Sequence, residues 1–172
     1  MKRINIHFPF ELSQEQYARL FAPWMKYSWG RRALSIANLV CASIFYIAYP
    51  ICILLLWIGE DPRLAKALLI PALSFVLLSV IRKLINRPRP YEAWGFAPLL
   101  RKESKGVSFP SRHIFSAFII AATVAYITPW GHLLLIPALL LATIRVIGGV
   151  HYPSDVTAGA IFAGLAALLY LL

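Results

Sequence analysis

Charged residues are scarce in this sequence. Asp, Glu, Lys and Arg together make up 14% of its 172 residues, whereas hydrophobic residues make up 60% and the mean hydropathy is +0.70. A soluble globular domain usually contains about 25% charged residues, so this composition excludes an ordinary soluble protein. The chain is expected to lie in a lipid bilayer.

Cysteine is also scarce, with two residues in the whole chain. Cys41 and Cys52 fall in one apolar segment, and if that segment is helical they lie about 16 Å apart along its axis. A disulfide requires Cα atoms within about 7 Å of one another, so these cysteines are not expected to form one. They are expected to pack as small apolar groups.

Acidic residues number seven, against 17 Lys and Arg, which leaves a net charge of +10. No cluster of Asp, Glu and His in the sequence offers a plausible metal shell, so no metal or other cofactor is expected. The positive charge suits contact with anionic lipids, because each basic residue near such a surface contributes about 1 kcal/mol. We expect membrane lipids as partners and no nucleic acid, and no pattern indicates an oligomeric state.

Five apolar segments predict the fold. A transmembrane helix needs roughly 20 mainly apolar residues, and the segments cover approximately residues 33–58, 64–86, 111–128, 132–149 and 154–172. The predicted fold is an all-α, polytopic transmembrane bundle of about five spans. The ends of the second and fourth segments then share one face with the starts of the third and fifth, and the polar residues discussed below fall on that face.

Residues 1–30 carry too many charges to cross a membrane. Ser13 and Gln16 fit a capping box, which predicts a short amphipathic helix at the interface from about residue 13. Pro23 is expected to kink or end that helix. The chain is therefore expected to consist of an amphipathic interfacial segment, 1–30, and a transmembrane domain, 31–172.

Two polar clusters lie next to the second and third apolar segments. Residues 82–90 bring four cations to a helix end, and they fit either positive-inside anchoring or an arginine clamp for phosphate. Residues 108–113 precede an apolar helix whose backbone N–H groups favour a bound phosphate. On the simpler alternative, Ser111 is only a helix cap and His113 an interfacial side chain.

A third cluster joins Arg145, His151 and Asp155 across the connection between two helices. A carboxylate near a histidine can fix the tautomer of the ring and stabilise its cationic form, which leaves the other ring nitrogen able to attack. Alternatively, Asp155 only complements a helix N-terminus and Arg145 snorkels. Ionisable groups that flank apolar spans are costly, and three such clusters on one face favour a functional site.

These clusters resemble the three-part signature of the type 2 phosphatidic acid phosphatase family, in its membrane lipid phosphatase branch. The order and internal spacings agree for Arg82 with Arg89-Pro90, for the run 110–113, and for the third cluster, over roughly residues 64–172. The resemblance implies a helical core that holds phosphate between the motifs, a phosphohistidine intermediate and no metal cofactor.

The resemblance also implies roles for individual residues. His151 would be the nucleophile, Asp155 its orienting partner, and His113 the acid that protonates the leaving group. The phosphate would be bound by Arg82, Arg89 and Arg145, together with Ser111 and the backbone around Arg112.

Three positions depart from the usual family pattern. Arg82 stands where lysine is common, Arg112 where glycine is common, and Ile144 where a serine usually precedes the arginine. None of these changes removes a residue that the chemistry needs, but they bear on substrate preference. Many members of the family also have six spans, and the N-terminal segment is expected to take the position of the missing one.

The expected function is hydrolysis of a phosphate monoester or diphosphate on a lipid. Phosphatidic acid, phosphatidylglycerophosphate, phosphorylated lipid A and an isoprenyl diphosphate such as undecaprenyl diphosphate all fit, and isoprenyl diphosphate is the first expectation from the family's bacterial roles. A phosphotransferase with the same site and a non-catalytic protein that binds anionic lipids are the alternatives. His113, His151 and Asp155 argue against the second, because electrostatic binding of lipid requires none of them.

The expected location is the bacterial plasma (inner) membrane, but two arguments disagree on the side of the active site. All Lys and Arg residues except Arg63 and Lys66 fall on the predicted catalytic side, so the positive-inside rule places the site in the cytoplasm. The resemblance points outward, because bacterial lipid phosphatases of this family commonly face that way. We favour the cytoplasmic side on the charge balance.

Overall fold

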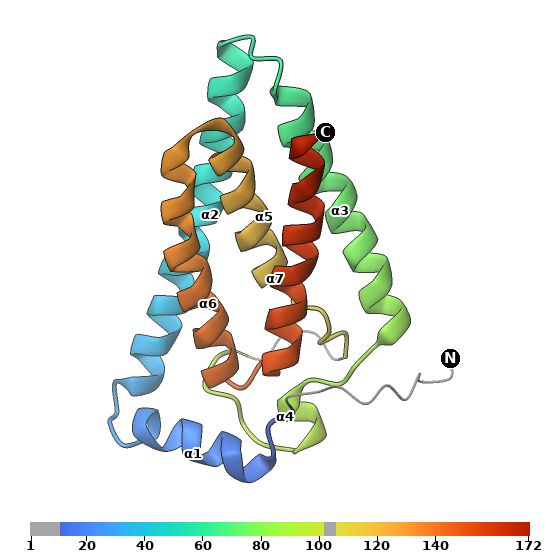
Figure 1. Ribbon diagram of the computed structural model, residues 1–172. Helices are drawn as coiled ribbons and strands as arrows, with labels where there is room; N and C mark the ends of the chain where they lie inside the picture. Colours follow the sequence, from blue (N-terminus) through green and yellow to red (C-terminus); the bar gives the residue numbers. More distant parts are fainter. Residues whose placement is uncertain (1–10, 102–105) are drawn as a thin grey trace.

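The computed structural model describes residues 11–101 and 106–172, and within those ranges it contains helices and no strands (Figure 1). The helices that run along the molecule are α2 (Gly30–Ile58), α3 (Leu64–Ile85), α5 (Arg112–Ile127), α6 (Leu135–Ile147) and α7 (Pro153–Ala167). A 3-10 helix, η1 (Pro129–Leu134), precedes α6, and another, η2 (Leu168–Leu171), follows α7. Two further helices, α1 (Gln14–Met25) and α4 (Pro90–Ala93), lie at one end of the molecule. The prediction of an all-α bundle with an additional N-terminal helix is confirmed.

The predicted apolar segments are all helical, but they differ in length. Four stretches of the described residues are long and apolar enough to cross a membrane, namely Gly30–Ile58, Leu64–Ala93, Pro129–Ile147 and Pro153–Leu171. With 16 residues, α5 is shorter and extends over about 24 Å. It contacts α2, α3, α6 and α7 and lies at the centre of the bundle (Figure 1). Four full-length spans therefore accompany a shorter inner helix.

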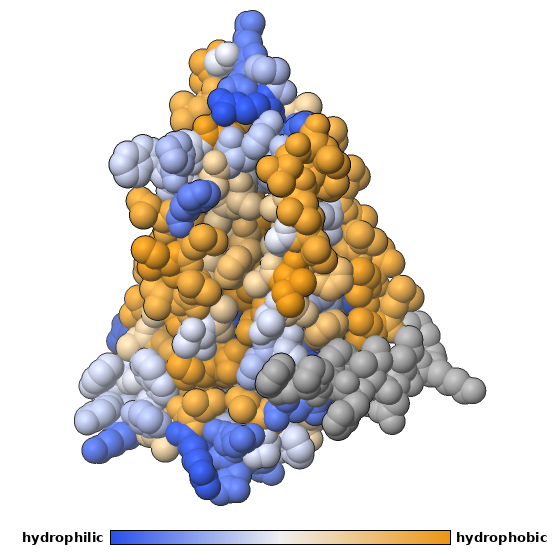
Figure 2. Space-filling model, viewed as in Figure 1, coloured by the Kyte–Doolittle hydropathy of each residue, from blue (hydrophilic) through white to orange (hydrophobic). Residues whose placement is uncertain are grey.

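Large apolar side chains cover the outside of the bundle. Leu55, Leu73 and Leu139 are 65%, 66% and 59% exposed. Figure 2 shows hydrophobic residues along the middle of the visible face and hydrophilic ones gathered toward both ends. Such an extensive apolar surface is rare on soluble proteins, and hydrocarbon tails are the surroundings that it fits.

A close approach between α5 and α7 determines where the polar residues of the two helices meet. A Cβ atom added at Gly159 would lie 2.7 Å from the carbonyl oxygen of Ser111, so only glycine allows α7 to pass this near to the start of α5. The Ser111 N–H donates to the carbonyl of Asp155 at 2.9 Å. The first turns of α5 and α7 are thereby held side by side.

Helix α1 lies across the end of the bundle where α5 and α7 begin (Figure 1). Its N-terminus has the predicted capping box, because the Gln16 N–H donates to Ser13 Oγ and the Ser13 N–H donates to Gln16 Oε1. Pro23 lies near the end of the helix, as expected. The predicted helix is confirmed, whereas residues 1–10 of the predicted interfacial segment lie outside the described residues.

The polar clusters share one face, as the order of the helices predicts. The ends of α3 and α6 and the starts of α5 and α7 all lie at the end of the bundle that α1 covers (Figure 1). Asn86 ends α3 in the left-handed conformation, with φ 46°, and turns the chain toward Arg87 and Arg89. The bundle therefore brings the three sequence clusters to a single location.

Candidate active site

The centre of the site is a buried pair formed by His151 and Asp155. Asp155 lies in the first turn of α7, and His151 lies in the connection that precedes this helix; their side chains are 0% and 1% exposed. The distance from His151 Nδ1 to Asp155 Oδ2 is 3.3 Å. The same Oδ2 accepts from the backbone N–H of Tyr152 at 3.0 Å, which completes the cap of the helix.

Burial keeps the imidazole of His151 neutral. Removal from solvent is the largest influence and lowers the pKa of His151 to about 3; Arg145 and Arg89 lower it further, while Asp155 raises it. With Nδ1 directed at Asp155, Nε2 is the ring nitrogen that can act as a nucleophile. A neutral ring with Nδ1 toward Asp155 is the form in which Nε2 could act as a nucleophile.

Asp155 has two further partners that the sequence did not indicate as site residues. Arg87 Nη1 donates to Oδ1 at 2.6 Å, and Ser108 Oγ donates to Oδ2 at 2.5 Å. Both residues belong to the predicted clusters, 82–90 and 108–113, but the family motif assigns roles to their neighbours. Their positions in those clusters were the only signal available in the sequence.

Buried arginines surround this pair. Among the described residues, the charged side chains that are almost fully enclosed are Arg82, Arg87, Arg89, Arg145 and Asp155. Arg87 pairs with Asp155 and also with Glu11, and the other three arginines lie in the same enclosed end of the bundle. The planar, multidentate guanidinium groups are suited to bind phosphate oxygens.

Two of these arginines also shape the backbone of the site. Arg82 Nη1 donates to the carbonyl oxygens of Ser108 and Pro110, which holds the loop before α5 against the end of α3. Arg89 Nη1 donates to the carbonyl of Val150 at 3.1 Å, next to His151. Both predicted phosphate ligands therefore lie at the site and fix the two loops that form it.

The start of α5 offers further donors. Ser111 is its N-cap residue, and the Ser111 Oγ is buried and has no hydrogen-bond partner among the described residues. The backbone N–H groups of the first helical turn point out of the helix end and attract anions. The side chain of Arg112, in contrast, is exposed and lies over the ring of Phe75 at 5.9 Å. Any contact between Arg112 and phosphate is therefore expected through its backbone.

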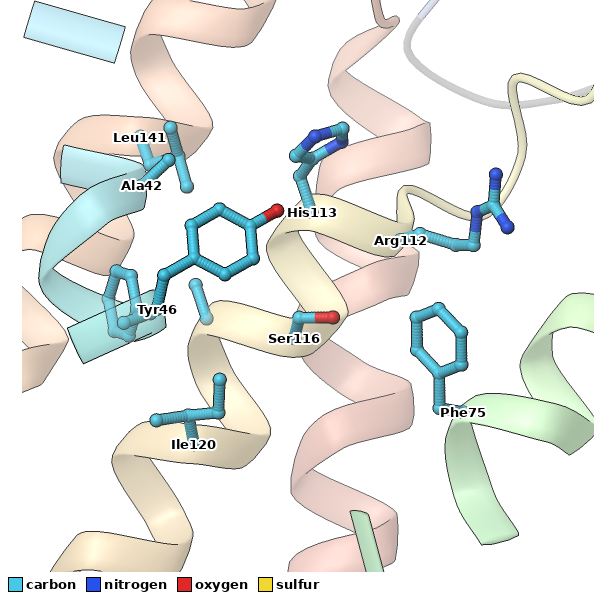
Figure 3. Close-up of a pocket in the computed structure, with 10 residues that line it drawn as sticks. Ala42, Tyr46, Phe75, Arg112, His113, Ser116, Ile120 and Leu141 are labelled. Atoms are coloured by element: carbon cyan, nitrogen blue, oxygen red, sulfur yellow. The ribbon is translucent and has the colours of Figure 1, made fainter. Parts of the chain in front are cut away.

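His113 lies between two cavities of different character. A cavity of about 330 Å³ with mixed walls is lined by the polar residues Ser35, Asn38, Arg101, His113 and Arg145 and by Leu39 and Leu100. An apolar cavity of about 200 Å³ lies on the other side, and Tyr46, Phe75 and Ser116 contribute to its walls (Figure 3). Figure 3 shows His113 and Arg112 leaving the first turn of α5 in different directions, with Arg112 toward Phe75.

The structure thus brings the predicted residues together in two groups. His151 and Asp155 are in direct contact, and Arg145 and His113 line one cavity. Within residues 11–101 and 106–172, no three His, Cys, Asp or Glu side chains gather as they would around a metal ion.

Comparison with known proteins places this arrangement in a family. A family model described as PAP2 superfamily matches residues 63–172. The lipid A 1-phosphatase of Rhizobium johnstonii is 35% identical over 102 residues, which are 56% of this chain and 41% of that protein. The lipid A 1-phosphatase of Rhizobium etli is 34% identical over 102 residues, which are 56% of this chain and 44% of that protein. The match therefore spans less than half the length of these curated relatives.

Solved structures show the same fold at lower identity. LpxE of Aquifex aeolicus superimposes with a TM-score of 0.73 and 22% identity, covering 96% of this chain and 98% of that one. A transmembrane PAP2-type phosphatidylglycerolphosphate phosphatase of Bacillus subtilis superimposes with a TM-score of 0.68 and 22% identity. The superposition covers 92% of this chain and 84% of that one. Because the family model matches more than half of the chain, this integral membrane protein belongs to the PAP2 superfamily.

Proposed function

We propose that the protein is a membrane lipid phosphatase that works through a phosphohistidine at His151 without a metal ion. The observation that carries the proposal is the neutral, buried His151 held by Asp155 among buried arginines. A cluster that only attracted anionic lipid headgroups would need neither a carboxylate-bound imidazole nor its enclosure.

The residues support a two-step reaction. His151 Nε2 attacks the phosphorus atom, a P–N bond forms, and the bond from phosphorus to the leaving oxygen breaks while His113 protonates that oxygen. Water then attacks the phosphorus atom and gives a proton to His113, which lost its own in the first step, while the P–N bond breaks; inorganic phosphate leaves and both histidines are regenerated. Arg82, Arg89, Arg145 and the N-terminus of α5 with Ser111 and Arg112 balance the charge on the phosphoryl oxygens in both steps.

The surroundings of His113 support a lipid as the leaving group. The apolar cavity beside His113 continues into a second one of about 240 Å³, since Phe75, Ser116 and Ile120 line both (Figure 3). An apolar path thus begins beside the proposed acid and follows α5 between α2 and α3. We propose that the transmembrane domain, residues 31–172, binds the substrate tail there and that residues 1–30 lie on the membrane surface.

The lipid itself is proposed only as a class. The proteins that resemble this chain include lipid A 1-phosphatases and a phosphatidylglycerolphosphate phosphatase. These names favour two of the four substrates expected from the sequence, and phosphatidic acid and undecaprenyl diphosphate stay as the other candidates. Transfer of the phosphoryl group to an alcohol instead of water would use the same residues.

Phosphate release from a panel of these four lipids in detergent tests the proposal, with His151→Ala as the inactive control. Activity is expected on at least one lipid, unchanged by EDTA and inhibited by vanadate, which can mimic a five-coordinate phosphoryl group. Addition of glycerol distinguishes hydrolysis from transfer, because a transferase would form glycerol phosphate. Loss of activity in EDTA that a divalent ion restores would contradict the metal-independent reaction.

A further inference from the structure

We propose that two side chains of the N-terminal segment formed by residues 11–25 support the catalytic pair. Within this segment, Tyr17 and Glu11, the latter through Arg87, act as positioning residues for the pair of His151 and Asp155. The inference rests on the proposed function, since it concerns the same site. Glu11 and Tyr17 lie outside residues 63–172, which the family model matches, so their contacts are additional to it.

Tyr17 reaches the nucleophile from α1. Its side chain is 0% exposed, and its hydroxyl donates to the carbonyl oxygen of His151 at 3.0 Å. The ring packs against Phe96 and Tyr152, with centroids 5.3 and 6.3 Å away. Burial raises the pKa of Tyr17, so the hydroxyl keeps its proton and remains a donor. Helix α1 therefore holds the backbone of His151, the proposed nucleophile, through this hydrogen bond.

A second contact from the same segment reaches Asp155. The Glu11 carboxylate accepts from Arg87 Nη2 at 2.7 Å, and Arg87 Nη1 donates to Asp155 Oδ1 at 2.6 Å and to Ser154 Oγ at 2.9 Å. The Arg87 guanidinium also lies 4.0 Å from the centre of the Tyr152 ring. Ser108 and the Tyr152 N–H hold Oδ2 of Asp155, and the contact of Arg87 with Oδ1 helps to fix the rotation of the carboxylate toward His151. Arginine can hold both acids at once, since its donors diverge from one rigid plane.

The loop between α6 and α7 is shaped to accept α1. Gly149 has φ +72°, and a Cβ atom there would lie 2.6 Å from Cζ of Phe21. Only glycine lets the loop pass so near to this α1 side chain in that conformation. The helix thus contacts the catalytic loop at Gly149 and His151 and reaches Asp155 through Arg87, so a shift of α1 would disturb nucleophile and partner together.

The charges around the pair give a readout that a purely structural role would not produce. Asp155, Arg145 and Arg89 face His151, and Arg87 with its partner Glu11 faces Asp155 from the other side. Removal of the Arg87 cation strengthens the effect of the Asp155 carboxylate on His151, which favours the protonated ring. Removal of the Glu11 charge leaves Arg87 less compensated and has the opposite effect. The acid limb of kcat/KM should therefore move to higher pH in Arg87→Met and to lower pH in Glu11→Gln.

The experiment compares full-length protein purified in detergent as wild type, Tyr17→Phe, Glu11→Gln, Arg87→Lys and Arg87→Met. Glu15→Gln is the matched control for Glu11, because Glu15 pairs with Arg19 on the outer face of α1 and is 75% exposed. Tyr27→Phe, at a tyrosine that is 49% exposed, is the matched control for Tyr17. For each protein, kcat, KM and the pH profile are measured on the best lipid of the panel.

Loss of a buried hydrogen bond to a charged group predicts a fall in kcat of roughly 10- to 100-fold for Arg87→Met, and loss of a neutral one predicts roughly 2- to 10-fold for Tyr17→Phe. KM should stay within about twofold, since these side chains position the dyad and not the phosphate, and Arg87→Lys should recover part of the rate. Both controls should match the wild type.

Two results overturn the inference in different ways. If the wild type is active while the kcat and acid limb of every variant match those of the controls, the positioning role is refuted and the proposed function stands. If the wild type releases no phosphate from any lipid, both are refuted. Should Arg87→Met fail to elute as a folded protein, Glu11→Gln decides alone, because its side chain is 41% exposed and its acid limb must move to lower pH.

Discussion

Ser108 Oγ donates a hydrogen bond to Asp155 Oδ2, the carboxylate oxygen that also faces His151 Nδ1. Arg82, near the end of α3, donates a hydrogen bond to the backbone carbonyl of Ser108 and so holds the loop before α5. The end of α3, this loop and the start of α7 therefore come together around the Asp155 carboxylate. The hydroxyl and the Tyr152 N–H stabilise the ionised form of Asp155 from within the buried site. This arrangement makes the loop before α5 a support for the nucleophile as well as part of the phosphate cradle.

Ser108→Ala should therefore slow the reaction without preventing substrate binding. Loss of a buried hydrogen bond to an ionised acceptor predicts a decrease of roughly tenfold or more in kcat, with little change in KM. Steady-state kinetics in detergent checks this, with Ser28→Ala, at an exposed position between α1 and α2, as control. A change in KM alone would show that Ser108 contacts substrate instead.

Substitution of His151 and substitution of His113 should affect the reaction rate differently when the leaving group is changed. His151→Ala is expected to abolish turnover of every substrate while the protein stays folded, because no nucleophile is left. His113→Ala should slow a lipid phosphate far more than a nitrophenyl phosphate, whose leaving group needs no protonation. Rates on both substrates, with elution profiles to verify folding, test the division of roles. Equal losses on the two substrates would exclude His113 as the acid.

Activity should persist below the pH at which an ordinary histidine becomes protonated. Burial lowers the pKa of His151 to about 3 in the folded protein, against about 6.5 in an unfolded chain. The acid limb of kcat/KM should therefore lie well below pH 6.5. Because the unfolded chain binds the additional proton, the free energy of unfolding should also fall as the pH drops from about 6.5 toward 3. An acid limb near 6.5 would show that His151 is solvated in the working enzyme.

The apolar path along α5 should discriminate lipids from soluble phosphate esters. Ser116 lines both of its cavities, so Ser116→Leu should fill the path and raise KM for a lipid phosphate about tenfold or more, while a nitrophenyl phosphate is hydrolysed as before. Ala122→Leu is the matched control, because Ala122 lies on the same helix and lines a different cavity between α5, α6 and α7. Equal effects of both substitutions would mean that the lipid tail binds elsewhere.

The sequence predicted two things about the site, namely the contacts set by local spacing and the shared face set by the order of the spans. His151 and Asp155 are four residues apart at a helix start, so their contact follows from the chain alone. The contacts of Arg87, Ser108 and Tyr17 join residues 68, 47 and 134 positions apart. They depend on how the loops and α1 fold over the end of the bundle, which no local pattern records.

The direction of the Arg112 side chain was also not predicted from the sequence motif. Its neighbours Ser111 and His113 occupy positions in the site, but successive residues of a helix point about 100° apart. The Arg112 side chain consequently lies over Phe75, on the α3 side, while His113 lines the cavity that contains Arg145. The predicted role in binding phosphate concerned the backbone around Arg112, and it remains a prediction.

The side of the membrane on which the site lies is the last prediction. Helix α1 lies across the catalytic end of the bundle, so this helix and the site are on the same side of the membrane (Figure 1). Of the described Lys and Arg residues, only Arg63 and Lys66 lie toward the other end, and the positive-inside rule then predicts a cytoplasmic site. The outward orientation common among bacterial relatives predicts the reverse.

Labelling of single cysteines in intact cells decides between these orientations. Ser28→Cys lies in the exposed turn between α1 and α2, and Pro62→Cys lies in the exposed turn between α2 and α3 at the opposite end. In a background in which Cys41 and Cys52 are replaced, an impermeant thiol reagent should label position 62 and leave position 28 unlabelled until the cells are opened. Because the two turns are separated by the full length of α2, the reverse pattern would place the active site outside the cytoplasm.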